Sequence, residues 1–294
     1  MKMTHGMAVW VMVANTIMWS MAGVVTRHLE EARSFEVTFW RSFFTVLSLL
    51  VILPLWQGRG VLARLPWRSR YFWLSGLCWC VMFTAFMVAL TLTAVANVLI
   101  TMAVGPLLTA LITRVFLGQR LPVRTWVAIV LAGVGIGWMY GNQLSLGDPN
   151  FLVGSLVALC VPIAGAVQWT LVQKSQSEGQ HLDLVPSVLL GAIFSSLLTL
   201  PLAMPFQASA HDVGLLAALG LFQLAIPCAL SVVCARVLKA PEVSLLALLE
   251  IVFGIALAWW GANEAPQSSV MLGGSLVLGA LLMNQWLGWR QNNV

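Results

Sequence analysis

Long apolar runs without a charged residue are the feature that most constrains this chain. Each run is about 20 residues long, the length that a helix needs to cross a bilayer core of about 30 Å. The runs are continuous rather than alternating, which excludes a transmembrane β-barrel. Soluble proteins carry about 25% charged residues, whereas 9% of these residues are charged and 60% are apolar. The sequence therefore predicts an all-α integral membrane protein.

Ten membrane helices are predicted, five in each half of the chain. Their ranges are 8–26, 35–55, 70–91, 94–116, 124–140, 151–173, 184–204, 213–235, 241–262 and 269–288. The first run has no small-x-small cleavage site before the charged loop, so we interpret it as a membrane helix and not as a signal peptide. The linkers are short, and none could form a soluble domain.

A pattern in Phe86–Pro122 recurs about 145 residues later, in Ser231–Pro266. Each copy has a turn, a helix of small residues, a polar or proline break near its centre, and a polar end. Two such halves are typical of transporters built from structural repeats. We therefore predict a five-helix repeat at 1–141, an external linker at 142–150, and a second five-helix repeat at 151–294.

The positive charges predict the orientation. With the N-terminus inside the cell, twelve Lys and Arg residues fall inside and three fall outside, namely Arg27, Arg33 and Arg41. The positive-inside rule then places both termini in the cytoplasm, and five helices per half make the repeats inverted. We expect a multi-pass protein of the bacterial inner (cytoplasmic) membrane. The net charge of +5 is then a topology signal and does not indicate a nucleic-acid partner.

Several motifs indicate a family. They are Cys234-Ala235-Arg236 through Ala240, Val243-Ser244-Leu245-Leu246, Leu249-Glu250 and Asn263-Glu264, with first-half copies at Gly105-Pro106 and Leu117-Gly118-Gln119, and Phe39-Trp40-Arg41-Ser42-Phe43. This set resembles the EamA-type family of the drug/metabolite transporter (DMT) superfamily. The resemblance covers nearly the whole chain. It implies ten helices, both termini inside, a central cavity between the halves, and transport of small metabolites, often amino acids.

Two departures from the family pattern matter. Ile251 stands where the family usually has proline, so its helix is expected to bend less. Gln119 stands where the family often has glutamate.

Glu250 is the sharpest candidate for a functional residue. A carboxylate at bilayer depth is costly and usually faces a cavity or a partner. It lies on a stripe of small residues with Ser244, Ala247 and Gly254, so it should face protein or a cavity and not lipid. It is predicted to bind a proton or the ammonium group of a substrate. The alternative is a packing glutamate that is bonded to a neighbouring helix.

Seven other residues are predicted to contact the substrate: Asn15, Trp19, Trp79, Thr101, Gln168, Trp169 and Gln223. Amide and indole groups near mid-depth suit a zwitterionic or aromatic metabolite. Pro106 should break its helix near Met102, beside Thr101, and broken backbone at this depth is tolerated where it meets protein or a water-filled cavity. Ordinary packing is the alternative for each residue, since the chain has 14 tryptophans.

Arg41 lies in the outer third of its helix, where it could attract an anion at the outer mouth. We prefer a structural role, in which it pairs with Glu36 or another loop carboxylate or reaches toward the surface. No helix has Lys or Arg at its centre, so phosphorylated substrates are not expected. The five cysteines all fall in apolar runs, and no P-loop or hydrolase motif occurs. We therefore expect no cofactor and no metal, and the protein is not expected to be an enzyme.

The function predicted from sequence is secondary transport, with export of amino acids or related zwitterionic or aromatic compounds by alternating access. The expected partners are a small-molecule substrate, the lipid bilayer and, as a candidate coupling ion, protons. Two alternatives stay open. One is a membrane scaffold that transports nothing, and the other is an integral-membrane enzyme that acts on a lipid-linked substrate.

Overall fold

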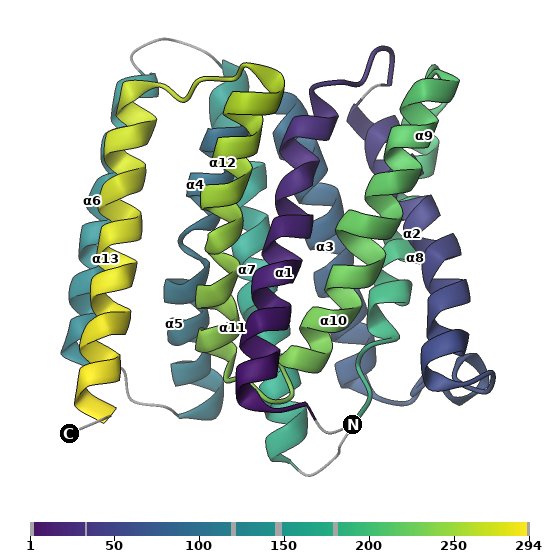
Figure 1. The fold of residues 1–294 in the computed structure, drawn as a ribbon, viewed down its shortest axis with the longest axis horizontal. Helices are drawn as coiled ribbons and strands as arrows, with labels where there is room; N and C mark the ends of the chain where they lie inside the picture. The colour runs from purple at the N-terminus through teal and green to yellow at the C-terminus, as the bar shows by residue number, and fades with distance from the viewer. Residues whose placement is uncertain (1–2, 33, 119–121, 145–148, 179–181, 293–294) are drawn as a thin grey trace.

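The computed structural model describes residues 3–32, 34–118, 122–144, 149–178 and 182–292, and these residues form helices and short connections without a strand (Figure 1). The helices are α1 His5–Thr26, α2 Ser34–Gln57, η1 Leu62–Arg64, α3 Arg70–Leu92, α4 Val95–Met102, α5 Gly105–Leu117, α6 Val123–Leu144, α7 Pro149–Ser177, α8 Ser187–Ala203, α9 Ala210–Ala218, η2 Leu219–Ala225, α10 Ile226–Cys234, α11 Ala240–Ala247, α12 Leu249–Ala262 and α13 Ser268–Asn292.

Seven helical stretches of the described chain are long and apolar enough to cross a membrane, which fits a multi-pass membrane protein. Two of them, Val95–Leu117 and Ala240–Ala262, run across a break between two helices. Three shorter apolar helices lie at Trp126–Gly135, Ser187–Ala203 and Met271–Ala280. The fold is therefore all-helical as predicted, and within the described residues seven of the ten predicted spans are long and apolar enough to cross a membrane.

The first broken helix behaves as its proline predicts. α4 ends at Met102 and α5 begins at Gly105. Pro106 has no N–H to donate to the carbonyl of Met102, and the N–H of Leu107 bonds to the carbonyl of Val104 at 3.0 Å. The helix therefore tightens into a turn and restarts.

The second broken helix is interrupted just before Ile251. α11 ends at Ala247 and α12 begins at Leu249, although no proline lies at this point. The N–H of Leu248 bonds to the carbonyl of Leu245, and the N–H of Ile251 bonds to the carbonyl of Leu248, both at 3.0 Å. These bonds span three residues instead of four, so the chain tightens locally without losing a donor.

The predicted helix 213–235 consists of three segments, with the π-helix η2 between α9 and α10. A Cβ on Gly220 would lie 2.8 Å from the carbonyl oxygen of Arg41 and 2.8 Å from Cβ of Phe44, so only glycine allows this approach of η2 to α2. The hydroxyl of Thr45 donates to the carbonyls of Arg41, at 2.8 Å, and Gly220, at 3.1 Å. This contact places the side chains of η2 beside α2.

Buried or half-buried carboxylates hold the loops at the end of the molecule opposite both termini (Figure 1). The carboxylate of Asp212 accepts the N–H groups of residues 30, 31 and 32 at 2.9–3.0 Å. Glu264 accepts the N–H of Val95 and the Nε–H of Arg27, each at 2.7 Å. Gln119 and residues 145–148 of the predicted linker lie outside the described residues.

Candidate functional site

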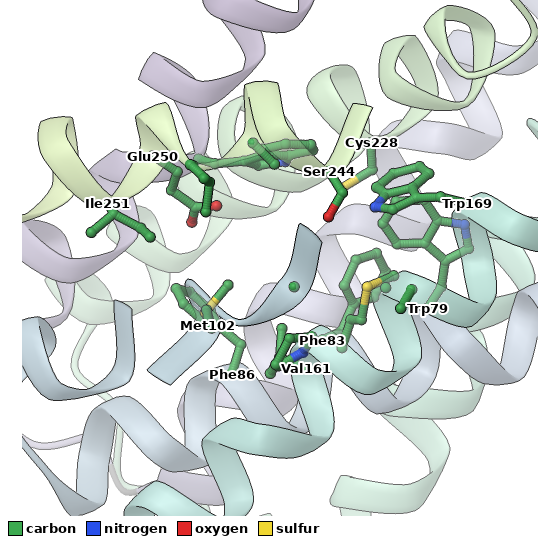
Figure 2. A pocket seen from close by; sticks show the side chains of 18 of the residues that line it. Trp79, Phe83, Phe86, Met102, Val161, Trp169, Cys228, Ser244, Glu250 and Ile251 are labelled. Carbon is green, nitrogen blue, oxygen red and sulfur yellow. The ribbon is translucent and has the colours of Figure 1, made fainter. Parts of the chain in front are cut away.

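A cavity with about 820 Å³ of space not filled by atoms lies among helices from both halves of the chain. Its wall comes from α1 to α5 in the first half of the chain, and from α7, η2, α10, α11 and α12 in the second half. Figure 2 shows Glu250 and Ser244 on one side of it and Met102, Phe86 and Val161 on the other.

Aromatic rings form much of the wall. Trp79 and Trp169 meet edge to face, with ring centroids 5.9 Å apart, and Trp79 lies 5.5 Å from Phe83 (Figure 2). A Cβ on Gly191 would lie 2.3 Å from Cβ of Trp79, so the glycine allows α8 to press on α3 and hold this ring in place. Such rings offer flat apolar surface with indole N–H donors at their edges.

Both helix breaks line the cavity. Met102, Gly105 and Pro106 belong to the first break, and Ala247 and Leu248 belong to the second. Irregular backbone at membrane depth is tolerated at such a place, because it meets protein or an aqueous cavity and not lipid.

Glu250 lines this cavity and is 8% exposed. It forms no hydrogen bond and no ion pair within 4.0 Å with any residue that the structure describes. The alternative of a packing glutamate bonded to a neighbouring helix therefore finds no bond in this structure. A carboxylate without a protein partner can accept a proton or a cationic group of a ligand.

Arg41 is a functional candidate that the sequence interpretation ranked below a structural role. It lines the cavity, is fully buried, and donates to Oε1 of Gln223 at 3.0 Å and to the carbonyl of Phe83 at 2.6 Å. The expected pairing with Glu36 is wrong, because Glu36 accepts backbone N–H groups of residues 207 and 208. Arg41 also does not reach the surface. A cation therefore lines the cavity, although no helix was predicted to have Lys or Arg at its centre.

Five of the eight residues predicted to contact the substrate line the cavity: Trp19, Trp79, Trp169, Gln223 and Glu250. They come from α1, α3, α7, η2 and α12, which are far apart in sequence. Their meeting in one cavity depends on the tertiary fold.

The other three predicted residues are fully buried but lie outside the cavity wall. The hydroxyl of Thr101 donates to the carbonyl of Asn97 at 2.7 Å, and Oε1 of Gln168 accepts from Ser75 at 2.7 Å. The side chain of Asn15 contacts the sulfur of Met12 at 3.9 Å. These contacts stabilise helix α1, helix α4 and the packing of α3 on α7.

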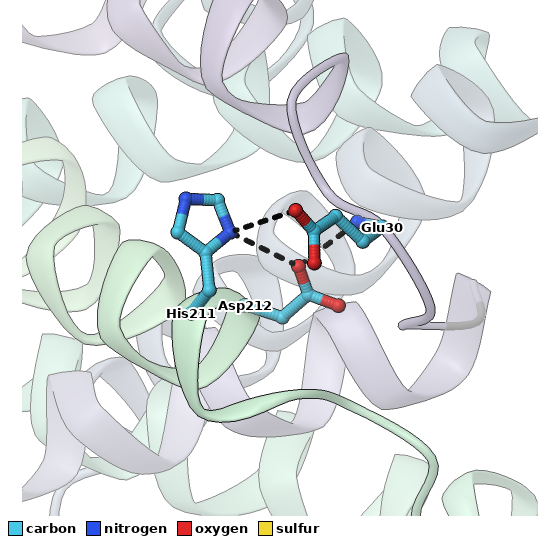
Figure 3. Close-up of side chains that lie close together, drawn as sticks. All are labelled: Glu30, His211 and Asp212. Atoms are coloured by element: carbon cyan, nitrogen blue, oxygen red, sulfur yellow. Dashed lines mark hydrogen bonds and ion pairs between the residues drawn. The ribbon is translucent and has the colours of Figure 1, made fainter.

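A second polar cluster, of Glu30, His211 and Asp212, lies at the far end of the molecule (Figure 3). Nδ1 of His211 lies 3.9 Å from Oε1 of Glu30 and 3.7 Å from Oδ1 of Asp212. Both oxygens of Asp212 already accept backbone N–H groups, so a metal ion would compete with these bonds. We interpret the cluster as a loop anchor.

The family comparison covers the first part of the chain, including Arg41 and Gly105-Pro106. Residues 6–141 match the sequence model of the EamA-like transporter family. The first part of the chain is therefore similar to this family. The family is part of the DMT superfamily, so the resemblance inferred from the motifs is confirmed. Its members are membrane transporters, and together with the apolar helices this match indicates a multi-pass membrane protein.

The fold of the EamA-like protein has a solved counterpart. A structure titled only "Crystal structure of protein" covers 97% of this chain and 99% of its own, with a TM-score of 0.68 and 18% sequence identity. This likeness concerns the fold alone. No curated protein matches the chain.

Proposed function

We propose that this EamA-like protein is a secondary transporter that exports small metabolites, such as amino acids or related zwitterionic or aromatic compounds, by alternating access. The observation that supports this best is the central cavity. Its walls come from both halves of the chain, its surface is largely apolar with several aromatic rings, and it contains the carboxylate of Glu250, which bonds to no residue that the structure describes.

The proposed architecture is a pair of inverted five-helix repeats, at 1–141 and 151–294, joined outside the cell by 142–150. It is supported by α4 (Val95–Met102) and α11 (Ala240–Ala247), whose bounds differ by 145 residues at both ends and which both end at a break in the cavity wall. The charge count along the chain supports cytoplasmic termini in a bacterial inner membrane. Rocking of one repeat against the other would then open the cavity to either side.

The proposed role of Glu250 is to bind a coupling proton or the ammonium group of the substrate. Either role requires a carboxylate that can change partners, and a residue already bonded inside the protein could not change partners freely. The aromatic wall formed by Trp19, Trp79 and Trp169 is proposed to receive the apolar part of the substrate.

The test is flux in proteoliposomes loaded with a panel of amino acids and related metabolites, with and without a pH gradient. Wild type is compared with Glu250→Gln. Glu242→Gln is the matched control, because Glu242 lies on the adjoining α11, pairs with His5 at 2.8 Å, and lies outside the cavity wall. We expect wild type and the control to transport at least one compound of the panel.

If Glu250→Gln loses only the dependence on pH, Glu250 is the coupling site. If it loses all flux while it remains folded, Glu250 binds the substrate directly. If purified wild type moves no compound of a broad panel in either direction, the transporter proposal fails for these substrates, and a membrane scaffold becomes the better explanation.

A further inference from the structure

Arg41 is a buried cation whose partners are all neutral. Its guanidinium group donates to the amide oxygen of Gln223 and to the backbone carbonyl of Phe83, and it lies 5.9 Å from the centre of the Phe86 ring. Its Nε–H is buried and has no acceptor. A buried charge is costly unless an opposite charge compensates it. Arg41 therefore leaves a positive charge and a free donor beside the cavity that it lines.

The backbone around Arg41 keeps this side chain inside the protein. Close packing of Gly220 on the carbonyl of Arg41 brings η2 against α2, and Thr45 bridges the two segments. The wide turn of the π-helix then presents Gln223 to the guanidinium group. Because two acceptors from different helices hold its terminal nitrogens, Arg41 is fixed in orientation, as a binding group must be.

Glu250 provides the opposite charge in the same cavity, but it does not neutralise Arg41 by contact. The two residues interact electrostatically, yet no ion pair within 4.0 Å joins them. Among the described residues, each charge is thus left without a contacting counter-ion, and the remaining wall is mostly apolar and aromatic. A ligand with a negative group, a positive group and an apolar body would match all three features.

We propose that Arg41 binds the carboxylate of the substrate while Glu250 binds its ammonium group, so that the cavity selects α-amino acids with an apolar or aromatic side chain. This proposal rests on the proposed transport function and makes Arg41 a determinant of specificity. Gln223 acts as a positioning residue that orients the guanidinium group.

The test measures binding with three matched probes: phenylalanine carries both charges, phenylalanine methyl ester lacks the carboxylate charge, and 3-phenylpropionate lacks the ammonium group. Binding to purified protein is followed by intrinsic tryptophan fluorescence, because Trp19, Trp79 and Trp169 line the cavity. We expect wild type to bind phenylalanine at least tenfold more tightly than either analogue.

The variants separate the two charges. Arg41→Gln should abolish the preference for phenylalanine over its ester but retain the preference over 3-phenylpropionate. Glu250→Gln should abolish the preference over 3-phenylpropionate but retain the preference over the ester. Arg41→Lys keeps the charge and should retain the preference over the ester. Arg236→Gln is the matched control, because Arg236 pairs with Asp183 outside the cavity wall and should leave both ratios unchanged.

The proposal is overturned if wild type binds the ester as tightly as phenylalanine, if it binds none of the three probes, or if Arg41→Gln keeps the wild-type ratio. If Arg41→Gln does not fold, the proposal is tested by the ratios with which wild type and Arg41→Lys bind phenylalanine and its two analogues. A purely structural arginine would weaken all three probes alike when it is replaced. Failure of the transport proposal can be distinguished from failure of this binding proposal. In that case phenylalanine would bind more tightly than both analogues but would not be transported.

Discussion

Asp212 provides a quantitative test of how the loops at the end opposite the termini are held. Its side chain is fully buried, and its two oxygens accept three backbone N–H groups of the α1–α2 connection at 2.9–3.0 Å. In Asp212→Ala all three donors lose their acceptor. A net contribution of about 1 kcal/mol per bond gives a loss of about 3 kcal/mol in the free energy of unfolding.

Two effects shift this value in opposite directions. Bonds to an ionised acceptor are stronger than neutral ones, which raises the loss. Glu30 and Glu31 are exposed, so water can replace part of what their N–H groups lose. We therefore expect a loss of about 2–4 kcal/mol, which lowers the midpoint of thermal unfolding in detergent by about 3–6 °C. Protease cleavage in the connection between α1 and α2 should become faster.

The controls are the two exposed neighbours in Figure 3. The side chains of Glu30 and His211 are 65% and 55% exposed, so Glu30→Gln and His211→Ala should each change the stability by less than about 0.5 kcal/mol. A loss below 1 kcal/mol for Asp212→Ala would refute the reasoning. If His211→Ala destabilises as strongly as Asp212→Ala, and a chelator lowers the midpoint of wild type, a bound metal holds the cluster instead.

Two further predictions concern helix contact and access to the cavity. Gly220→Ala should lower the free energy of unfolding by about 1–3 kcal/mol, because the alanine Cβ would lie 2.8 Å from the backbone of α2. Gly214→Ala, whose Cβ would have no atom within 4 Å, should leave the protein equally stable or more stable in thermal unfolding. Equal effects of the two variants would contradict this contact. Cys228 lines the cavity, so a bound substrate should cover its thiol. In a variant that retains only this cysteine, phenylalanine should therefore slow alkylation of the Cys228 thiol, which is measured by mass spectrometry. The corresponding Cys80 variant should not respond, because Cys80 lies outside the cavity wall, and slowing in both would indicate a global effect.

The part of the site that could be predicted from sequence is the part that depends on local chemistry. Continuous apolar runs predicted the helices, and the missing N–H of Pro106 predicted the first break. Glu250 was conspicuous because a carboxylate is rare at this depth. These inferences need only the neighbouring residues along the chain.

Arg41 and the π-helix could not be predicted in this way. A position in the outer third of α2 does not reveal that a long side chain meets Gln223 from η2 and the backbone of α3, because that requires knowing which helices are neighbours. The π-helix at Leu219–Ala225 likewise accompanies the close contact of Gly220 with α2, which lies far away in sequence. Tertiary contacts override local propensity at such points.

The break at Leu248 raises the question of whether a proline would fit at Ile251, as the family pattern suggests. Ile251 is the third residue of α12, and its N–H makes one bond, of 3.0 Å, to the carbonyl of Leu248. Proline is tolerated in the first turn of a helix, where N–H groups often lack a partner within the helix. Ile251→Pro should therefore cost only about 1 kcal/mol, the value of the one lost bond.

Ile255→Pro is the matched comparison, because Ile255 lies in the interior of the same helix and a proline there costs about 3 kcal/mol or more. Thermal unfolding and size-exclusion profiles in detergent distinguish the two variants. If Ile251→Pro unfolds the protein as readily as Ile255→Pro, the interruption at Leu248 is not a relaxed helix start. Its equivalence to the break before Pro106 would then fail, and with it the main support for two repeats that meet at the cavity.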